Sequence, residues 1–183
     1  MLAKAKYRKD YKQPDFTVTD IFLDFQLDPN HTVVTAKTTF QRLNDEATHL
    51  RLDGHGFQFA SIKFNGEDFK HYHQDHESLT LDLTNLSAAN FELEIVTNLE
   101  PAQNTSLQGL YQSGEGICTQ CEAEGFRQLT YMLDRPDVLA RYTTKITADK
   151  TKYPYLLSNG NRIASGELGD GRHWVCRLYT SDA

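Results

Sequence analysis

The sequence predicts an all-β fold, either a saddle-like β-sandwich or a set of curved antiparallel sheets, with at most one or two short helical turns. Apolar and polar residues alternate over many short stretches, which is the period of half-buried strands. Turn dipeptides separate these stretches, and no long stretch has the 3.6-residue period of an amphipathic helix. The 183 residues, 39% of them hydrophobic, suffice for one domain with a substantial core.

Two long strands are predicted near the N-terminus. Residues 16–18 alternate in one phase and residues 21–27 in the other. A one-residue change of phase turns the buried side chains to the other face, so a bulge near Thr19 and Asp20 is expected. Pro29 and Asn30 have the composition of a turn, and residues 34–40 form the second strand.

Shorter strands and hairpins follow. Alternation indicates strands at 50–52, 57–64, 79–83 and 91–95. Asn65 and Gly66 suit a two-residue hairpin turn because both tolerate positive φ. A hairpin through Asn159 and Gly160 is expected to join strands at 153–157 and 162–164, and another is expected to turn at Asp170 and Gly171. One helical turn is expected at 136–140, capped by Asp134.

Residues 104–127 differ from the rest of the chain. They contain four glycines, two cysteines and three glutamates, with little alternation. We expect a long irregular loop on a β scaffold, and such loops often carry function.

Composition and charge exclude some classes of partner. The net charge of -6 and the lack of a basic stripe argue against nucleic acid. No apolar run reaches the roughly 20 residues needed to span a bilayer, so no membrane insertion is expected. The first fifteen residues lack the apolar core of a secretory signal, and three cysteines are an odd number. A cytoplasmic location is therefore expected.

Cys118 and Cys121 have the spacing of half a zinc knuckle or of a redox pair. A structural zinc site needs four ligands, and Cys176 is the only other cysteine. Two reduced cysteines that pack in a loop are the favoured interpretation, and a metal or redox role stays open as an alternative.

Three histidines, His71, His73 and His76, cluster in one region that is interpreted as an exposed hairpin edge. His76 and Glu77 begin like the H-E-x-x-H motif of zinc peptidases, but Thr80 stands where the second histidine is needed. No G-x-S-x-G elbow or phosphate-binding loop occurs. We therefore expect no catalytic residue, no metal ligand and no cofactor in this chain.

A sharper signal lies in the acidic part of the loop. Glu122, Glu124 and Gln120 stand between Gly116 and Gly125. Two carboxylates and an amide could bind a cation such as a substrate ammonium group. The alternative is a solvated acidic loop.

Long runs of the chain resemble the bacterial aminopeptidase N family of gluzincin zinc metallopeptidases. The runs are NTSLQGLYQSGEGICTQCEAEGFR (104–127), TYMLDRPDVLARYTTKITADK (130–150), YPYLLSNGNR (153–162) and AKYRKDYKQPDFTVTDIFLDFQLD (5–28). The similarity is weakest at 44–89. The resemblance implies that residues 1–183 are the N-terminal saddle-like β domain of a four-domain protein involved in peptide catabolism, which removes N-terminal residues from peptides. Its zinc, H-E-x-x-H and G-A-M-E-N elements would lie in the absent catalytic domain.

The resemblance also implies roles for individual residues. In the family the T-Q-C-E-A-E-G loop reaches the active site, so Gln120 and Glu122 would contact the substrate and recognise its free α-amine. Glu124 is expected to be structural and paired with Arg127. The expected partners are the peptide N-terminus and the catalytic domain.

The end of the chain departs from the family pattern. Residues 176–183 look truncated or foreign, and an incomplete last strand would favour self-association through a sheet edge. A non-catalytic β-sandwich that docks a protein partner is the alternative function.

Overall fold

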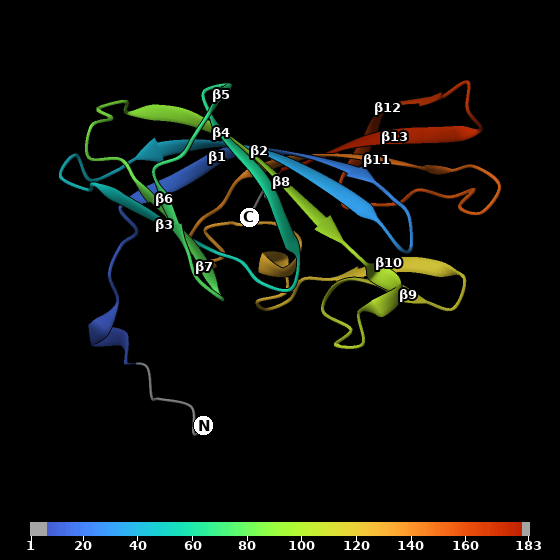
Figure 1. Ribbon diagram of the computed structural model, residues 1–183, viewed down its shortest axis with the longest axis horizontal. Coiled ribbons are helices and arrows are strands. Elements are labelled where there is room, and N and C mark those ends of the chain that lie inside the picture. The colour runs from blue at the N-terminus through green and yellow to red at the C-terminus, as the bar shows by residue number, and fades with distance from the viewer. Residues whose placement is uncertain (1–6, 181–183) are drawn as a thin grey trace.

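The computed structural model describes residues 7–180 and confirms the all-β class (Figure 1). One curved sheet of eight strands dominates the fold. In the order in which they lie side by side, its strands are β12 (Asn161–Glu167), β13 (Arg172–Tyr179), β11 (Arg141–Asp149), β1 (Phe16–Gln26), β2 (Thr32–Arg42), β8 (Asn90–Leu99), β4 (Gln58–Phe64) and β5 (Glu67–Asp68). Neighbouring strands pair antiparallel except β1 and β11, which pair parallel.

Two smaller sheets lie against one face of the large sheet (Figure 1). The first contains β3 (His49–Asp53), β7 (Ser78–Asp82) and β6 (Tyr72–Gln74). The second is the hairpin of β9 (Gly109–Ser113) and β10 (Gly116–Gln120). The segment from 121 to 140 crosses between them. Together these elements form the second layer of a sandwich, which the alternating pattern predicts.

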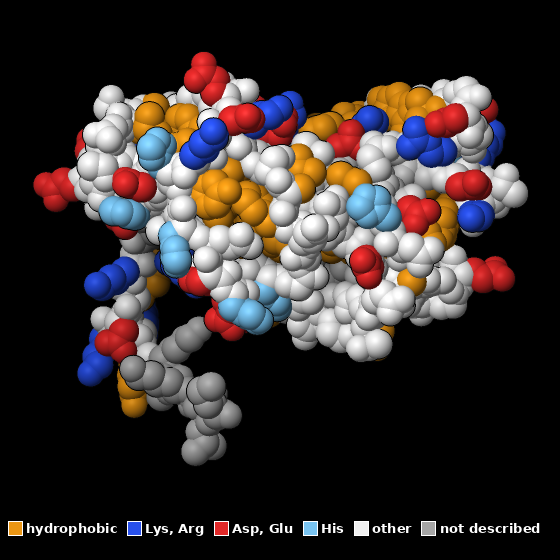
Figure 2. Space-filling view, in the orientation of Figure 1, with side chains coloured by type: hydrophobic (Ala, Val, Ile, Leu, Met, Phe, Trp, Pro, Cys, Tyr) orange, Lys and Arg blue, Asp and Glu red, His pale blue; other side chains and the backbone are white. Residues whose placement is uncertain are grey.

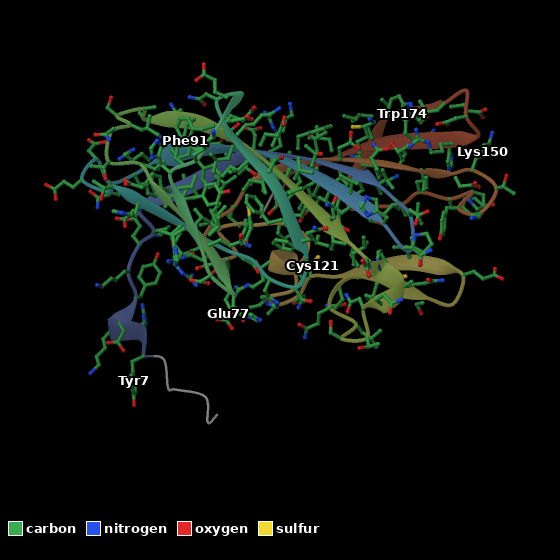
Figure 3. The ribbon with its side chains drawn as sticks, in the orientation of Figure 1. Tyr7, Glu77, Phe91, Cys121, Lys150 and Trp174 are labelled. Atoms are coloured by element: carbon green, nitrogen blue, oxygen red, sulfur yellow. The ribbon has the colours of Figure 1, made fainter. Side chains whose placement is uncertain are left out.

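Aromatic stacking holds the core between the layers. Phe91 on β8 stacks on Phe40 and Phe64 with ring centroids 5.4 and 4.9 Å apart. Phe16 meets the same ring edge-on at 6.1 Å. Figure 3 labels Phe91 on the large sheet, near β4. Such pairs add about 0.5–1.5 kcal/mol each beyond burial of their area.

Ion pairs bridge neighbouring strands on the outer face of the large sheet. Glu94 on β8 pairs with Lys37 at 2.9 Å and Lys63 at 3.3 Å, so it bridges two neighbouring strands. The hydrogen bond from Lys37 lowers the pKa of Glu94 despite partial burial. Lys145 and Asp24 form a similar pair between β11 and β1. Figure 2 shows charges of both signs side by side along the upper edge, as expected of a face turned to water.

Two local predictions are confirmed. The register of β1 against β2 shifts between Val18 and Asp20, where the change of phase predicts a bulge. Asn65 and Gly66 both have positive φ and connect β4 to β5.

Other local predictions are wrong. Residues 104–127 are not an irregular loop throughout, because they contain the β9–β10 hairpin. Residues 153–158 form no strand, and β12 pairs with β13 instead. The described residues contain three 3-10 turns, η1 (Arg8–Asp10), η2 (Pro101–Gln103) and η3 (Phe126–Gln128). None is at 136–140, where the chain makes a single hydrogen-bonded turn from Val138 to Arg135.

The C-terminal residues fall in two parts. Residues 176–179 complete β13, which pairs on both sides, whereas residues 181–183 lie outside the described residues. Strand β12 is one edge of the large sheet, and its first residues are exposed. In the described part of the chain, no helix has the length and apolar character needed to cross a membrane.

Gly160 should be more sensitive to substitution than Gly171. Both have positive φ, but a Cβ on Gly160 would lie 2.1 Å from the Leu178 carbonyl oxygen, whereas one on Gly171 would meet nothing. We expect Gly171→Ala to cost about 1–2 kcal/mol from backbone conformation alone, and Gly160→Ala to cost at least about twice as much. Urea unfolding of both variants measures this difference, and equal losses would contradict it.

Candidate functional site

The candidate site is the sharp turn that follows β10. The Gly125 amide donates a hydrogen bond to the Cys121 carbonyl oxygen at 2.8 Å and closes the turn. A Cβ on Gly125 would lie 2.2 Å from the Gln120 carbonyl oxygen, so this close approach requires glycine. The peptide bond between Glu122 and Ala123 is cis. The hydrogen bond and the close approach at Gly125 hold residues 120–124 in a tight turn.

A largely buried ion pair anchors the turn from behind. Arg127 Nε lies 2.8 Å from Asp134 Oδ2, and the Arg127 side chain also donates to the Asp134 carbonyl oxygen at 3.0 Å. Burial opposes the charge on Arg127, but Asp134 outweighs it and raises the pKa of the guanidinium. The expected role of Asp134 as a helix cap is wrong, because its carboxylate is the partner of Arg127.

Glu124 contacts Arg127 as the sequence predicts, but the contact is weak. The two charged groups are 3.6 Å apart, and the Glu124 side chain is 67% exposed. An exposed pair of this kind contributes roughly 0–1 kcal/mol. The position of the turn therefore depends mainly on Asp134.

The two residues singled out by the sequence lie on the same rim. Gln120 and Glu122 are both exposed and border one groove. The Gln120 side-chain amide donates to the Glu122 carbonyl oxygen at 3.1 Å. Among the described residues, no side chain forms an ion pair with the Glu122 carboxylate or donates a hydrogen bond to it. Its oxygens are thus free to accept hydrogen bonds from a ligand.

The groove has a volume of about 650 Å³ and lies between the large sheet and the β9–β10 hairpin. Figure 3 shows Cys121 beneath the large sheet, beside η3. Apolar side chains dominate the groove, and they come from distant parts of the chain: Leu23, Phe25, Leu27, Leu110, Ile117, Phe126, Leu129, Tyr142, Ile146, Leu157 and Tyr179. The sequence pattern could not indicate this groove, because packing between remote segments creates it.

The floor of the groove is uncharged near neutral pH. Burial, with a contribution from Asp134, raises the pKa of the Tyr142 phenol to about 12 and that of the Cys121 thiol to about 11. Phe126 packs edge-on against Tyr142 with centroids 5.9 Å apart. A free carboxylate beside an apolar floor is suited to a ligand with an ammonium group next to an apolar portion.

The cysteines and histidines considered for a metal or redox role do not come together in one site among the described residues. Cys118 is exposed, Cys121 is partly buried and Cys176 is buried, and all three are free thiols. In residues 7–180, no group of three or more His, Cys, Asp or Glu side chains is placed to hold a metal ion. This also applies to His71, His73 and His76, and no step of a reaction is assigned to them.

The fold and the exposed turn define a β-sandwich domain that presents an acidic turn beside an apolar groove. A sequence profile described as the Peptidase M1 N-terminal domain matches residues 7–177, and the chain belongs to this family. The resemblance predicted from the T-Q-C-E-A-E-G region and its flanking runs is therefore confirmed.

Two relatives show how much of a longer protein this chain represents. The chain is 85% identical over 175 residues to aminopeptidase N of Haemophilus influenzae, which covers 96% of this chain and 20% of that protein. It is 54% identical over 172 residues to aminopeptidase N of Escherichia coli, which covers 94% and 19%. The chain thus spans about a fifth of the length of these relatives.

Solved structures have the same fold. A Legionella pneumophila aminopeptidase A in complex with aspartic acid matches with a TM-score of 0.84 and 33% identity over 94% of this chain and 21% of that one. An M1 zinc metallopeptidase from Deinococcus radiodurans matches with a TM-score of 0.75 and 15% identity over 91% and 39%. At that lower identity the likeness concerns the fold alone.

Cys118 should react with thiol reagents before Cys121. The thiolate is the nucleophile, and the raised pKa keeps Cys121 protonated until pH approaches about 11. We expect iodoacetamide at pH 7.5 to label Cys118 first, and labelling of Cys121 to increase as pH rises toward 11. Mass spectrometry of labelled peptides identifies the site. Equal rates at both cysteines would contradict the burial of Cys121.

Removal of Asp134 should loosen the turn more than removal of Glu124. Asp134→Ala leaves Arg127 largely buried without its main partner, which costs about 3–5 kcal/mol for a buried pair. Glu124→Ala removes an exposed partner and should cost at most about 1 kcal/mol. Chemical unfolding compares the two variants. A loss for Glu124→Ala as large as that for Asp134→Ala would show that the anchor is misassigned.

Proposed function

We propose that this chain is the N-terminal domain of a larger zinc-dependent aminopeptidase that removes N-terminal residues from peptides. In this proposal residues 1–183 form one domain, and zinc binding and hydrolysis belong to a catalytic domain that follows it. A cytoplasmic location remains a prediction from the sequence. The names of the relatives, with a coverage of about a fifth of their length, support the assignment to a longer peptidase.

The role proposed for this domain is recognition of the substrate amine by Gln120 and Glu122. The observation that supports it is the free, exposed Glu122 carboxylate at the rim of an apolar groove. A peptide α-ammonium group would donate a charge-assisted hydrogen bond to this carboxylate. The Gln120 amide would bind the first residue of the peptide.

This binding would fix which peptide bond is cleaved. Holding the charged end of the substrate places the first peptide bond at a constant distance from the turn. In a complete enzyme of this class, zinc supplies the activated water. The residues of this chain would orient the substrate and would transfer no proton. The turn needs its rigid support from Gly125 and Arg127, because a misplaced carboxylate would orient the amine poorly.

The alternative is a β-sandwich module that binds another protein without taking part in catalysis. It would use the same apolar groove but would give Glu122 no kinetic role. Kinetics of variants at Glu122 therefore separate the two functions.

Glu122→Ala should impair an enzyme that carries this domain. We suggest residues 1–177 of this chain in place of the equivalent part of the Haemophilus influenzae relative, which is 85% identical. Loss of a hydrogen bond between charged groups should lower kcat/KM on an aminoacyl-anilide by about 10- to 100-fold. Glu115→Ala, in the exposed turn between β9 and β10, serves as the matched control and should keep normal kinetics. Unchanged kinetics for Glu122→Ala would overturn the proposal.

A further inference from the structure

Two Asn-Gly dipeptides occur in the sequence, Asn65–Gly66 and Asn159–Gly160. Asparagine is among the thermolabile residues of proteins. A glycine that follows it has no Cβ, so its amide nitrogen is open to approach by the asparagine side chain. That nitrogen can attack the side-chain amide and displace ammonia without an enzyme. The surroundings of the two asparagines in the fold decide which of them reacts faster.

Asn65 is held by β8 through both its backbone and its side chain. Its backbone amide donates a hydrogen bond to the Glu92 carbonyl oxygen at 2.9 Å, and its side-chain Oδ1 accepts one from the Glu92 amide at 2.8 Å. These two bonds fix the turn between β4 and β5, in which Asn65 and Gly66 have positive φ. Rotation of the Asn65 side chain toward the Gly66 nitrogen breaks the bond from Glu92, which opposes the reaction.

Asn159 lacks these restraints. Its side chain is exposed, and no described residue forms a hydrogen bond with its amide group. The backbone amides of residues 155–160 donate no backbone hydrogen bond to another described residue, and the pairing of β12 with β13 begins only at Asn161. Arg177 donates two hydrogen bonds to the Gly160 carbonyl oxygen, at 3.2 and 2.8 Å. Gly160 is therefore held with its nitrogen unbonded, while the Asn159 side chain is free to rotate against it.

We propose that Asn159 is a site of spontaneous deamidation in this chain. The Gly160 nitrogen loses its proton and forms a bond with Cγ of Asn159, and the Cγ–Nδ2 bond breaks, so that ammonia leaves with a proton. Water then opens the resulting cyclic imide at either of its carbonyl carbons. One opening gives aspartate at this position, and the other gives isoaspartate, in which the main chain runs through the former side chain. No atom is oxidised or reduced, and water is the sole co-reactant.

The modification changes the charge of the groove. Asn159 lines the groove together with Glu122, and Glu122 is the single residue among the described lining residues that is charged near neutral pH. Deamidation adds a second carboxylate to the same lining. Clefts lined by charges of one sign concentrate the opposite ions, so the groove attracts cations more strongly after the reaction. This charge depends on the age of the protein, and the assignment does not depend on the proposed function.

Peptide mapping of the chain tests this assignment. Trypsin cleaves after Lys and Arg, so residues 64–70 and 153–162 are released as separate peptides with one Asn-Gly each. After incubation of the folded chain at mildly alkaline pH, the peptide 153–162 should gain about 1 Da, as replacement of the amide by a carboxyl group requires. Asn159 should convert at least about five times faster than Asn65, the effect of one hydrogen bond. Equal rates, or faster conversion of Asn65, would overturn the proposal.

Two controls separate the fold from the local sequence. In concentrated urea neither asparagine is held, so both should convert at similar rates, and an excess at Asn159 that persists there would refute the structural cause. Asn159→Gln lengthens the side chain and disfavours closure of the imide ring. In this variant the gain in mass should disappear from residues 153–162, whereas residues 64–70 should behave as before. If the gain in mass persists, Asn161 in the same peptide is its source and the assignment fails.

Discussion

The second layer of this sandwich is smaller than the first, and this difference governs the fold. Eight strands form the large sheet, but the three-stranded sheet and the segment from 121 to 140 cover only part of its inner face. The continuous core follows this coverage, since it includes β1, β2 and β8 and excludes Ile146 and Val175 on β11 and β13. Where coverage ends, the inner face opens into the groove. The groove therefore results from incomplete layering of the sandwich.

The same layering positions the turn at Gln120–Glu122. Strand β10 runs along the border of the covered region and ends where the chain must return toward the core. Gly125 permits the sharp reversal, and Arg127 fixes it against Asp134. Because these contacts involve the backbone and buried groups, the turn does not depend on the Glu122 side chain for its stability. The carboxylate is therefore available to a ligand or partner.

Alternation in the sequence predicted the parts of the fold that have one buried face. Strands β1, β2 and β8 and the bulge at Val18–Asp20 could be read directly, because burial imposes a period of two. The β9–β10 hairpin could not, since its second strand has no buried residue to produce alternation. Residues 153–157 alternate Tyr153, Tyr155 and Leu157 without forming a strand, so this alternation reflects an apolar surface rather than pairing. The parallel pairing of β1 with β11 joins segments more than a hundred residues apart, and no local pattern encodes it.

The candidate site, like the fold, could be predicted from the sequence only in part. Composition indicated an acidic turn, and the resemblance to a family pointed to Gln120 and Glu122 within it. The groove beside them could not be predicted, because it depends on Tyr142, Leu157 and Tyr179 from three remote segments. Exposed apolar side chains such as Tyr155 and Leu157 forgo the favourable free energy of transfer out of water. A sequence that keeps them exposed beside an open inner face gains that free energy only when another surface covers them. The incomplete second layer of this domain thus leaves an apolar groove open at the surface, with the carboxylate of Glu122 placed at its border.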